Sequence, residues 1–245
     1  MALPADDKID VLDRGFVRLV DFMGSDQSVV TAARVSYGSG SKGEEKDRKL
    51  ITYMLTHDHM TPFEHAVFQF HVACPIFVMR QWIRHRIAST NEVSARYTEV
   101  KDEFYVPAQW RAPDAKNKQG SVDAPELDGQ RCTQVLREAY RNSYTAYQEL
   151  LKAGAAREMA RMVLPAALYT QFYWTLNARA LMHFINLRAD AHAQWEIQRY
   201  AEALAAIFRA KMPWTYEAFL LHSWKGTNPK LDSEKAALAG QAQPT

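Results

Sequence analysis

Cysteine, glycine, proline and net charge are all scarce in this sequence of 245 residues, and each shortage argues against a class of protein. The two cysteines, Cys74 and Cys132, form no CxxC pair, which argues against a disulfide scaffold or a zinc ribbon and favours a reducing, cytoplasmic compartment. Ten glycines and ten prolines are few for this length, so we expect neither a disordered nor a loop-dominated chain. No apolar run reaches the ~18 residues of a membrane span, and the first ten residues do not resemble a signal peptide.

What is present is the composition of an ordinary globular protein. Hydrophobic residues make up 47% and charged residues 24%, and the formal net charge is only +2. A strongly basic nucleic-acid binder is therefore not the first expectation. A chain of this length can also bury a core large enough to fold without a disulfide or a structural metal.

Hydrophobic periodicity predicts both strands and helices. Alternation predicts a hairpin over 9–23 and strands over 67–72 and 169–176. Helical spacing and capping residues predict helices over 25–36, 44–56, 75–85, 127–152, 155–164, 177–187 and 191–211, with a short one after Pro213. We find no internal repeat and no linker. The prediction is a single α+β domain over residues 1–225, helix-rich with an antiparallel sheet, followed by a frayed tail over 226–245.

The densest polar cluster is residues 80–97, RQWIRHRIASTNEVSARY. It contains four arginines against one acid, which gives +3 over 18 residues. If a helix continues to His85, Arg84 and Gln81 share its face. Arginine forks suit phosphates and planar carbonyl edges, so the cluster favours a nucleotide or cofactor site. A solvated basic helix face is the alternative, and charge alone does not decide between the two.

Two further clusters carry polar side chains at unusual density. Residues 57–65, HDHMTPFEH, hold three histidines and two acids, but their spacing matches no metal signature, and turn formation is favoured over metal binding. In residues 177–196, polar side chains such as Asn186 and Arg188 interrupt an apolar helix, and helix capping or ion pairing is the alternative to a functional role. Neither cysteine has the neighbours that would activate a thiolate.

Beyond these separate patterns, the order of several segments carries a resemblance. Arg84-His85-Arg86, followed by seven residues and Ser94, resembles the signature of flavin-dependent thymidylate synthases. The segments TPFEH (61–65), ARMVLP (160–165) and NLRADAHAQWE (186–196) resemble segments of that family, in the family's order. The tripeptide alone is a weak signal, but the ordered set is specific and spans roughly residues 8–225.

The resemblance implies a fold, a reaction and an assembly. The implied fold is a central antiparallel sheet flanked by helices. The implied reaction converts dUMP to dTMP, with the methylene group from 5,10-methylenetetrahydrofolate and the hydride from NADPH by way of bound FAD. The implied assembly is a homotetramer with active sites shared between subunits, with no metal, nucleic acid or membrane as partner.

The resemblance also implies roles for individual residues. Those implied to bind the flavin are Ser36, Thr61, Glu64, Arg84, His85, Arg86, Glu92, Asn177, Arg179 and His183. Those implied to bind the nucleotide are Gln81, Arg84, Glu92, Ser94, Arg96, Arg161 and Arg188. Arg188 is the implied catalytic residue and favours ionisation at uracil N3, while His59 lies near the flavin and folate. His183 departs from the family, which frequently has asparagine there, and it brings a titratable ring.

The chemistry of the residues agrees with this reaction. Uracil C5 is a poor nucleophile, and without a plausible catalytic cysteine the ring is expected to be activated by the charge of arginines beside a flavin. Two rival functions remain. A nucleic-acid-binding module could use the arginines with Trp82 and Tyr97, although the near-neutral net charge argues against it. A structural helical oligomerisation protein is the other.

Overall fold

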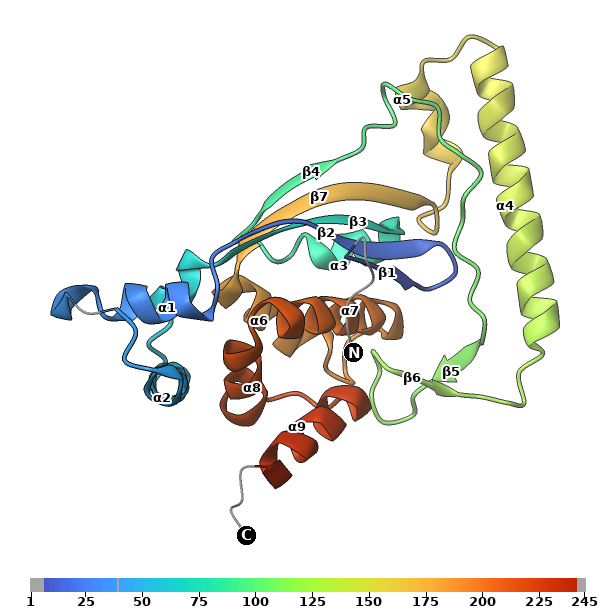
Figure 1. Cartoon of the computed structure of the whole chain (residues 1–245). Coiled ribbons are helices and arrows are strands. Elements are labelled where there is room, and N and C mark those ends of the chain that lie inside the picture. Colours follow the sequence, from blue (N-terminus) through green and yellow to red (C-terminus); the bar gives the residue numbers. More distant parts are fainter. Residues whose placement is uncertain (1–6, 39, 242–245) are drawn as a thin grey trace.

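The computed structural model describes residues 7–38 and 40–241, and at its centre lies a five-stranded antiparallel sheet (Figure 1). In spatial order the strands are β1 (Lys8–Val11), β2 (Gly15–Met23), β3 (Val67–Pro75), β7 (Tyr169–Asn177) and β4 (Ser89–Glu92). The predicted α+β domain with a central antiparallel sheet is thereby confirmed. Gly15, the first residue of β2, has no room for a side chain, because a Cβ there would clash with the Tyr200 hydroxyl oxygen.

Alternation along the central strands separates the two faces of the sheet. Phe68, Phe70 and Val72 are fully buried on one face, which α3 (Ile76–Trp82), α6 (Ala178–Arg188) and α7 (Trp195–Lys211) cover (Figure 1). On the other face His71 stacks on Tyr173, with 5.0 Å between ring centroids. The period of two in the sequence therefore identifies the face that packs on the helices.

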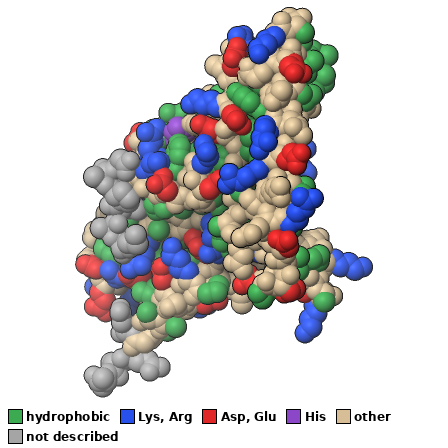
Figure 2. Space-filling model, turned by 90° about the vertical axis from the view of Figure 1, so that its right-hand side faces the viewer, with side chains coloured by type: hydrophobic (Ala, Val, Ile, Leu, Met, Phe, Trp, Pro, Cys, Tyr) green, Lys and Arg blue, Asp and Glu red, His purple; other side chains and the backbone are tan. Residues whose placement is uncertain are grey.

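The remaining helices lie around this core. Beyond one end of the sheet, α1 (Asp26–Ala33) and η1 (Val35–Tyr37) precede α2 (Glu44–Thr56), which packs on α8 (Pro213–His222) (Figure 1). The long α4 (Gly129–Lys152) runs along the opposite side, and α5 (Arg157–Ala160) and η3 (Arg161–Val163) follow it. On that side of the molecule basic and acidic side chains are interspersed (Figure 2). Within the described ranges, no helix has the length and apolarity needed to cross a membrane.

The expectation of a frayed tail from residue 226 is wrong for most of that segment. The structure has a helix there, α9 (Pro229–Gln241), which packs on α8. Leu231 is fully buried, and the indole Nε1 of Trp224 donates a hydrogen bond to Asp232 at 2.8 Å. The Lys/Ala/Gln-rich composition suggested fraying because it has little apolar surface, but one buried leucine and a few side-chain bonds hold the helix in place.

Two segments without hydrophobic alternation contain short strands. Polar residues 89–92 form β4 because the edge of β7 supplies backbone partners, with Ser89 opposite Thr175 and Glu92 opposite Phe172. The long loop over 107–130 contains a two-stranded sheet, β5 (Arg111–Pro113) with β6 (Ser121–Asp123). Backbone pairing in both places depends on a partner strand rather than on hydrophobic alternation.

Candidate functional site

A cleft with a volume of about 1220 Å³ opens at the end of the sheet where β7 passes into α6. Side chains from all three of the polar clusters seen in the sequence line it. Of the residues proposed from the resemblance, those that line the cleft are Glu64, Arg84, His85, Arg86, Asn177, Arg179, His183 and Arg188.

The register of the sheet explains why these segments meet. Val67 at the start of β3 lies opposite Asn177 at the end of β7. The turn η2 (Thr61–His65), just before β3, and helix α6, just after β7, therefore leave the sheet at the same end. The Asn177 side chain caps α6 by accepting a hydrogen bond from the Ala180 amide at 2.9 Å.

One ion pair joins these two segments across the mouth of the cleft. Arg179 on α6 contacts Glu64 on η2 at 2.6 Å. Both side chains are well exposed, so the pair adds little to stability but orients two polar groups toward the cleft. Thr61, at the start of η2, is exposed and lies just outside the cleft lining.

Arg188 is held by two acceptors at the inner side of the cleft. Its Nε donates to His85 Nε2 at 2.9 Å, and its Nη2 donates to the backbone oxygen of Gln81 at 3.2 Å. Because a guanidinium only donates, His85 must accept at Nε2 and carry its proton on Nδ1. Burial, then the charges of Arg188 and His183, lower the pKa of His85 to about 4, so the ring is neutral at pH 7.

Unpaired positive charge dominates the cleft. Arg84 and Arg86 follow α3 and are exposed, and in the described part of the chain neither forms an ion pair. Arg188 likewise has no acidic partner among the described residues. Burial lowers the pKa of Arg188, yet a guanidinium stays charged at neutral pH. Three guanidinium groups can therefore bind phosphates or carbonyl edges here.

The remaining proposed residues lie elsewhere on the chain. β4 runs away from the cleft, so Glu92, Ser94 and Arg96 lie toward the other end of the sheet. There Glu92 accepts from the Thr170 hydroxyl at 2.6 Å, and Arg96 pairs with Glu158 at 3.1 Å. Arg161 on η3 follows α5, which carries Glu158, and Ser36 is exposed on η1. One chain does not bring these five residues into the cleft, and Gln81 on α3 is also not among the residues that line it.

The histidine-rich segment forms an aromatic cluster at the end of α2. His57 stacks on Tyr53 with ring centroids 4.1 Å apart, and His59 meets the same ring edge-on at 5.8 Å. Nowhere in residues 7–38 or 40–241 do three His, Cys, Asp or Glu side chains converge as a metal site would require. Residues 61–65 of this segment form the turn η2, as the turn interpretation expects.

Residues near the C-terminus complete the cleft, and the sequence analysis missed them. His222 lines the cleft from the last position of α8, and Ser223 and Lys225 line it from the segment that follows. Asn186 ties this segment to α6, because its side chain donates to the Ser223 oxygen at 3.1 Å and accepts from the Lys225 amide at 3.1 Å. The available signal was Asn186 itself, a polar residue at an otherwise apolar helical position.

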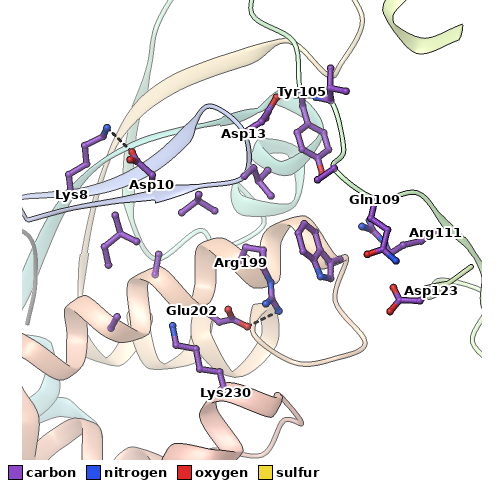
Figure 3. A pocket seen from close by; sticks show the side chains of 18 residues that line it. Lys8, Asp10, Asp13, Tyr105, Gln109, Arg111, Asp123, Arg199, Glu202 and Lys230 are labelled. Carbon is purple, nitrogen blue, oxygen red and sulfur yellow. Dashed lines mark hydrogen bonds and ion pairs between the residues drawn. The ribbon is translucent and has the colours of Figure 1, made fainter. Parts of the chain in front are cut away.

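A second cavity, with a volume of about 770 Å³, lies between β1, the segment around Tyr105 and α7 (Figure 3). Both of its arginines have acidic partners: Arg199 contacts Glu202 at 2.7 Å (Figure 3), and Arg111 contacts Glu196 at 2.6 Å. Lys8 also contacts Asp10 at 2.7 Å. None of the residues proposed from the resemblance lines it. The unpaired guanidinium groups thus single out the first cleft as the candidate active site.

Comparison with known proteins gives a consistent result. The family model described as "Thymidylate synthase complementing protein" matches residues 18–214. The chain is 59% identical over 218 residues to a flavin-dependent thymidylate synthase of Thermosipho africanus, covering 88% of this chain and 95% of that protein. It is 51% identical over 218 residues to a protein of the same name from Thermus thermophilus, covering 89% and 80%.

A solved structure agrees with these relatives. The crystal structure of the UMP/dUMP methylase PolB from Streptomyces cacaoi, bound with 5-Br dUMP, superposes with a TM-score of 0.81. Its sequence is 39% identical, and the match covers 89% of this chain and 100% of that one. Family match, sequence identity and fold agree over most of the chain, and the chain belongs to the flavin-dependent thymidylate synthase family.

Proposed function

We propose that the cleft binds FAD and dUMP and that the enzyme makes dTMP with 5,10-methylenetetrahydrofolate as carbon donor and NADPH as reductant. The observation that carries this proposal is the group Arg84, Arg86 and Arg188, three guanidiniums without acidic partners in the described chain, on a cleft of about 1220 Å³. FAD and dUMP both carry phosphates and a planar imide edge, which are the groups that arginine forks bind best. The donor set therefore fits both molecules.

Each of the two ligands has its own proposed set of contact residues. The flavin would be held by the lining residues Glu64, Arg84, His85, Arg86, Asn177, Arg179 and His183, together with Ser36, Thr61 and Glu92. The nucleotide would be held by Gln81, Arg84, Glu92, Ser94, Arg96, Arg161 and Arg188. When bound, the flavin supplies the hydride chemistry, and the protein binds, orients and polarises.

Arg188 has the geometry of a polarising group. A guanidinium has five N–H donors, of which His85 and the Gln81 oxygen each take one. The others are available for a uracil carbonyl and the adjacent nitrogen. Positive charge there stabilises negative charge at N3 and the neighbouring carbonyl, which raises the electron density at C5. A neutral His85 adds no competing positive charge beside the ring.

The direct test uses the purified protein. We expect it to bind FAD, with the visible absorption of a flavoprotein, and to form dTMP from dUMP when methylenetetrahydrofolate and NADPH are added, as measured by chromatography. A colourless protein that binds no added FAD and shifts single-stranded DNA in a gel would instead support the nucleic-acid-binding alternative.

Both cysteines are predicted to be dispensable for the reaction. Cys74 is fully buried, burial raises the pKa of its thiol, and neither cysteine lines the cleft. Both are free thiols, which fits the cytoplasmic location proposed for the enzyme. The variant Cys74→Ser/Cys132→Ser should keep its dTMP turnover per folded, flavin-loaded molecule, although serine at the buried position should cost about 1–3 kcal/mol of stability. Loss of turnover with FAD still bound would restore a thiolate mechanism.

We also propose a homotetramer with shared active sites. Ser94, Arg96 and Arg161 lie away from the cleft of their own chain. Large apolar side chains face solvent in both places: Ile87 in the cleft lining is 78% exposed, and Met162 beside Arg161 is 70% exposed. Such exposure is typical of a surface that another subunit covers. Light scattering should give a mass of about 112 kDa, four times 28.0 kDa.

Shared sites can be tested by mixing two inactive variants. Arg161→Ala and Arg188→Ala chains, purified separately and then allowed to exchange subunits, should regain part of the lost activity if the two residues serve one site from different subunits. A monomer that binds FAD and turns over dUMP, or mixed tetramers with no recovered activity, would contradict shared sites.

A further inference from the structure

Glu196 is a buried acid whose partners Tyr105 and Arg111 line the second cavity, and the proposed reaction gives it no role. It lies at the start of α7 with 3% of its surface exposed. Its two oxygens have separate partners. Oε1 accepts from Arg111 Nη2 at 2.6 Å and from the Tyr105 hydroxyl at 3.2 Å, whereas Oε2 accepts from Gln194 Nε2 at 2.8 Å.

A chain of side-chain hydrogen bonds leads from this carboxylate to Gln81. Gln194 donates to Glu196 through Nε2, and its own Oε1 accepts from Gln81 Nε2. Gln81 is the residue whose backbone oxygen accepts from Arg188. The buried acid is therefore linked, through two amides, to the residue that holds the proposed catalytic arginine.

The carboxylate fixes which end of each amide donates and which accepts along these hydrogen bonds. An amide can turn over and exchange its donor and acceptor ends, but a carboxylate can only accept. Gln194 must therefore direct its NH₂ group toward Glu196 and its oxygen toward Gln81. Gln81 must in turn use its NH₂ group on Gln194, which leaves its Oε1 as the acceptor that points elsewhere.

We propose that Glu196, acting through Gln194, is a positioning residue that fixes the Gln81 amide with Oε1 toward the bound nucleotide. The inference rests on the proposed function, in which Gln81 contacts dUMP. The site then presents an acceptor at Gln81 beside the donors of Arg188. In dUMP the donors that can meet this acceptor are the uracil N3–H, in the bound state before Arg188 favours its ionisation, and the 3′-hydroxyl of the sugar.

A purely structural role for Glu196 makes a different prediction. Arg111 and Tyr105 lie together on one side of the second cavity (Figure 3), and Glu196 could serve only to pair with them. These partners meet Oε1, whereas the Gln81 chain begins at Oε2. Glu196→Gln can keep an oxygen for Arg111 and Tyr105 while it replaces the acceptor at Oε2 with an NH₂ group. Gln194 and Gln81 would then both turn over, and Gln81 would present a donor to the nucleotide.

The test is calorimetric titration of the flavin-loaded protein with dUMP, 3-methyl-dUMP and 2′,3′-dideoxy-UMP. Each analogue lacks one of the two candidate donors. The wild-type protein should bind one of them about tenfold more weakly than dUMP, the usual effect of one hydrogen bond. In Glu196→Gln, affinity for dUMP should fall about tenfold, while affinity for that analogue stays unchanged. The ratio of the dUMP affinity to the affinity for that analogue should therefore fall from about ten in the wild-type protein to about one.

Three variants separate the possible outcomes. Arg111→Met removes the ion pair at Oε1 but leaves the Gln194 contact, so the wild-type ratio should persist. Gln194→Ala, at an exposed position, breaks the chain without touching Glu196 and should lower the ratio even if Glu196→Gln folds poorly. Gln81→Ala should weaken binding of dUMP.

Each failure has its own signature. A wild-type protein that binds no dUMP contradicts the proposed function itself. If dUMP binds but Gln81→Ala does not weaken it, or if neither analogue binds more weakly than dUMP, Gln81 offers no acceptor to the nucleotide and the inference is wrong. If Gln81→Ala weakens binding while Glu196→Gln and Gln194→Ala keep the wild-type ratio, the positioning role alone is overturned.

Discussion

Replacing Arg188 with alanine is expected to reduce dTMP formation by about ten- to a hundredfold while the protein keeps most of its flavin. If Arg188 contacts the uracil as proposed, the variant loses a charge-assisted hydrogen bond worth about 1.5–3 kcal/mol. Flavin binding should persist because Arg84, Arg86 and Arg179 remain on the cleft. The measurements are dTMP turnover and flavin absorbance per mole of protein.

The pKa of His85 provides a second readout of the Arg188→Ala substitution. Arg188 donates to His85 Nε2 and helps, after burial, to lower its pKa to about 4. In Arg188→Ala the pKa of His85 should rise, because a nearby positive charge is gone and the ring is better solvated. An NMR titration of the His85 ring measures this shift directly.

Arg188→Lys is the matched control. Lysine keeps the positive charge but cannot hold His85 and the Gln81 oxygen while also presenting several donors to a ligand. We expect activity between those of the wild-type protein and the alanine variant. If the alanine variant lost flavin and activity in equal proportion, Arg188 would be a structural residue and its catalytic role would be refuted.

Asp47→Asn is expected to lower the free energy of unfolding by about 3–5 kcal/mol, the largest loss of stability among the proposed substitutions. Asp47 on α2 is fully buried and contacts Arg34 Nη1 at 2.5 Å, and Arg34 is itself 8% exposed. Neutralising the acid leaves a buried guanidinium without its counter-charge. Asp47 also accepts from the Ser41 hydroxyl at 2.5 Å and the Lys42 amide at 3.2 Å, so the loop before α2 loses its anchor as well. Urea denaturation measures the change.

The pH dependence of this stability follows from the pKa of Asp47. Burial alone would raise the pKa, but hydrogen bonds from Ser41, Arg34 and the Lys42 amide lower it from its usual 3.8 to about 2. A lowered folded-state pKa means that this stabilisation is complete above about pH 4 and is lost as the pH falls toward 2. The wild-type protein and Asp47→Asn should therefore converge in stability over that range.

Glu45→Gln on the same helix is the control for Asp47→Asn. Glu45 pairs with Lys49 one turn along α2, and both side chains are strongly exposed, at 82% and 73%. Screening by solvent leaves such a pair with little effect, so no measurable loss of stability is expected. Equal effects of the two substitutions would show that the Arg34–Asp47 pair does not carry the stability assigned to it.

Local pattern was enough to predict much of the fold. Phe68, Phe70 and Val72 alternate with polar residues and form the buried face of β3, as their period of two requires. Asn177 caps α6 at the predicted junction of strand and helix. The ordered motifs were also sufficient to identify the family, because they depend on residue identity and order and not on contacts.

Tertiary structure decided the contacts between residues that are remote in the sequence. Arg188 meets His85 across 103 positions, and Gln81 meets Gln194 across 113. No periodicity encodes such pairs, because they depend on how the β3–β7 register and the packing of α3, α6 and α7 place separate segments. The same holds for α9, whose weak helical signal becomes a docked helix only because α8 offers a surface that buries Leu231. Short-range spacing thus determined the elements and the family, whereas long-range packing determined which polar groups share the cleft.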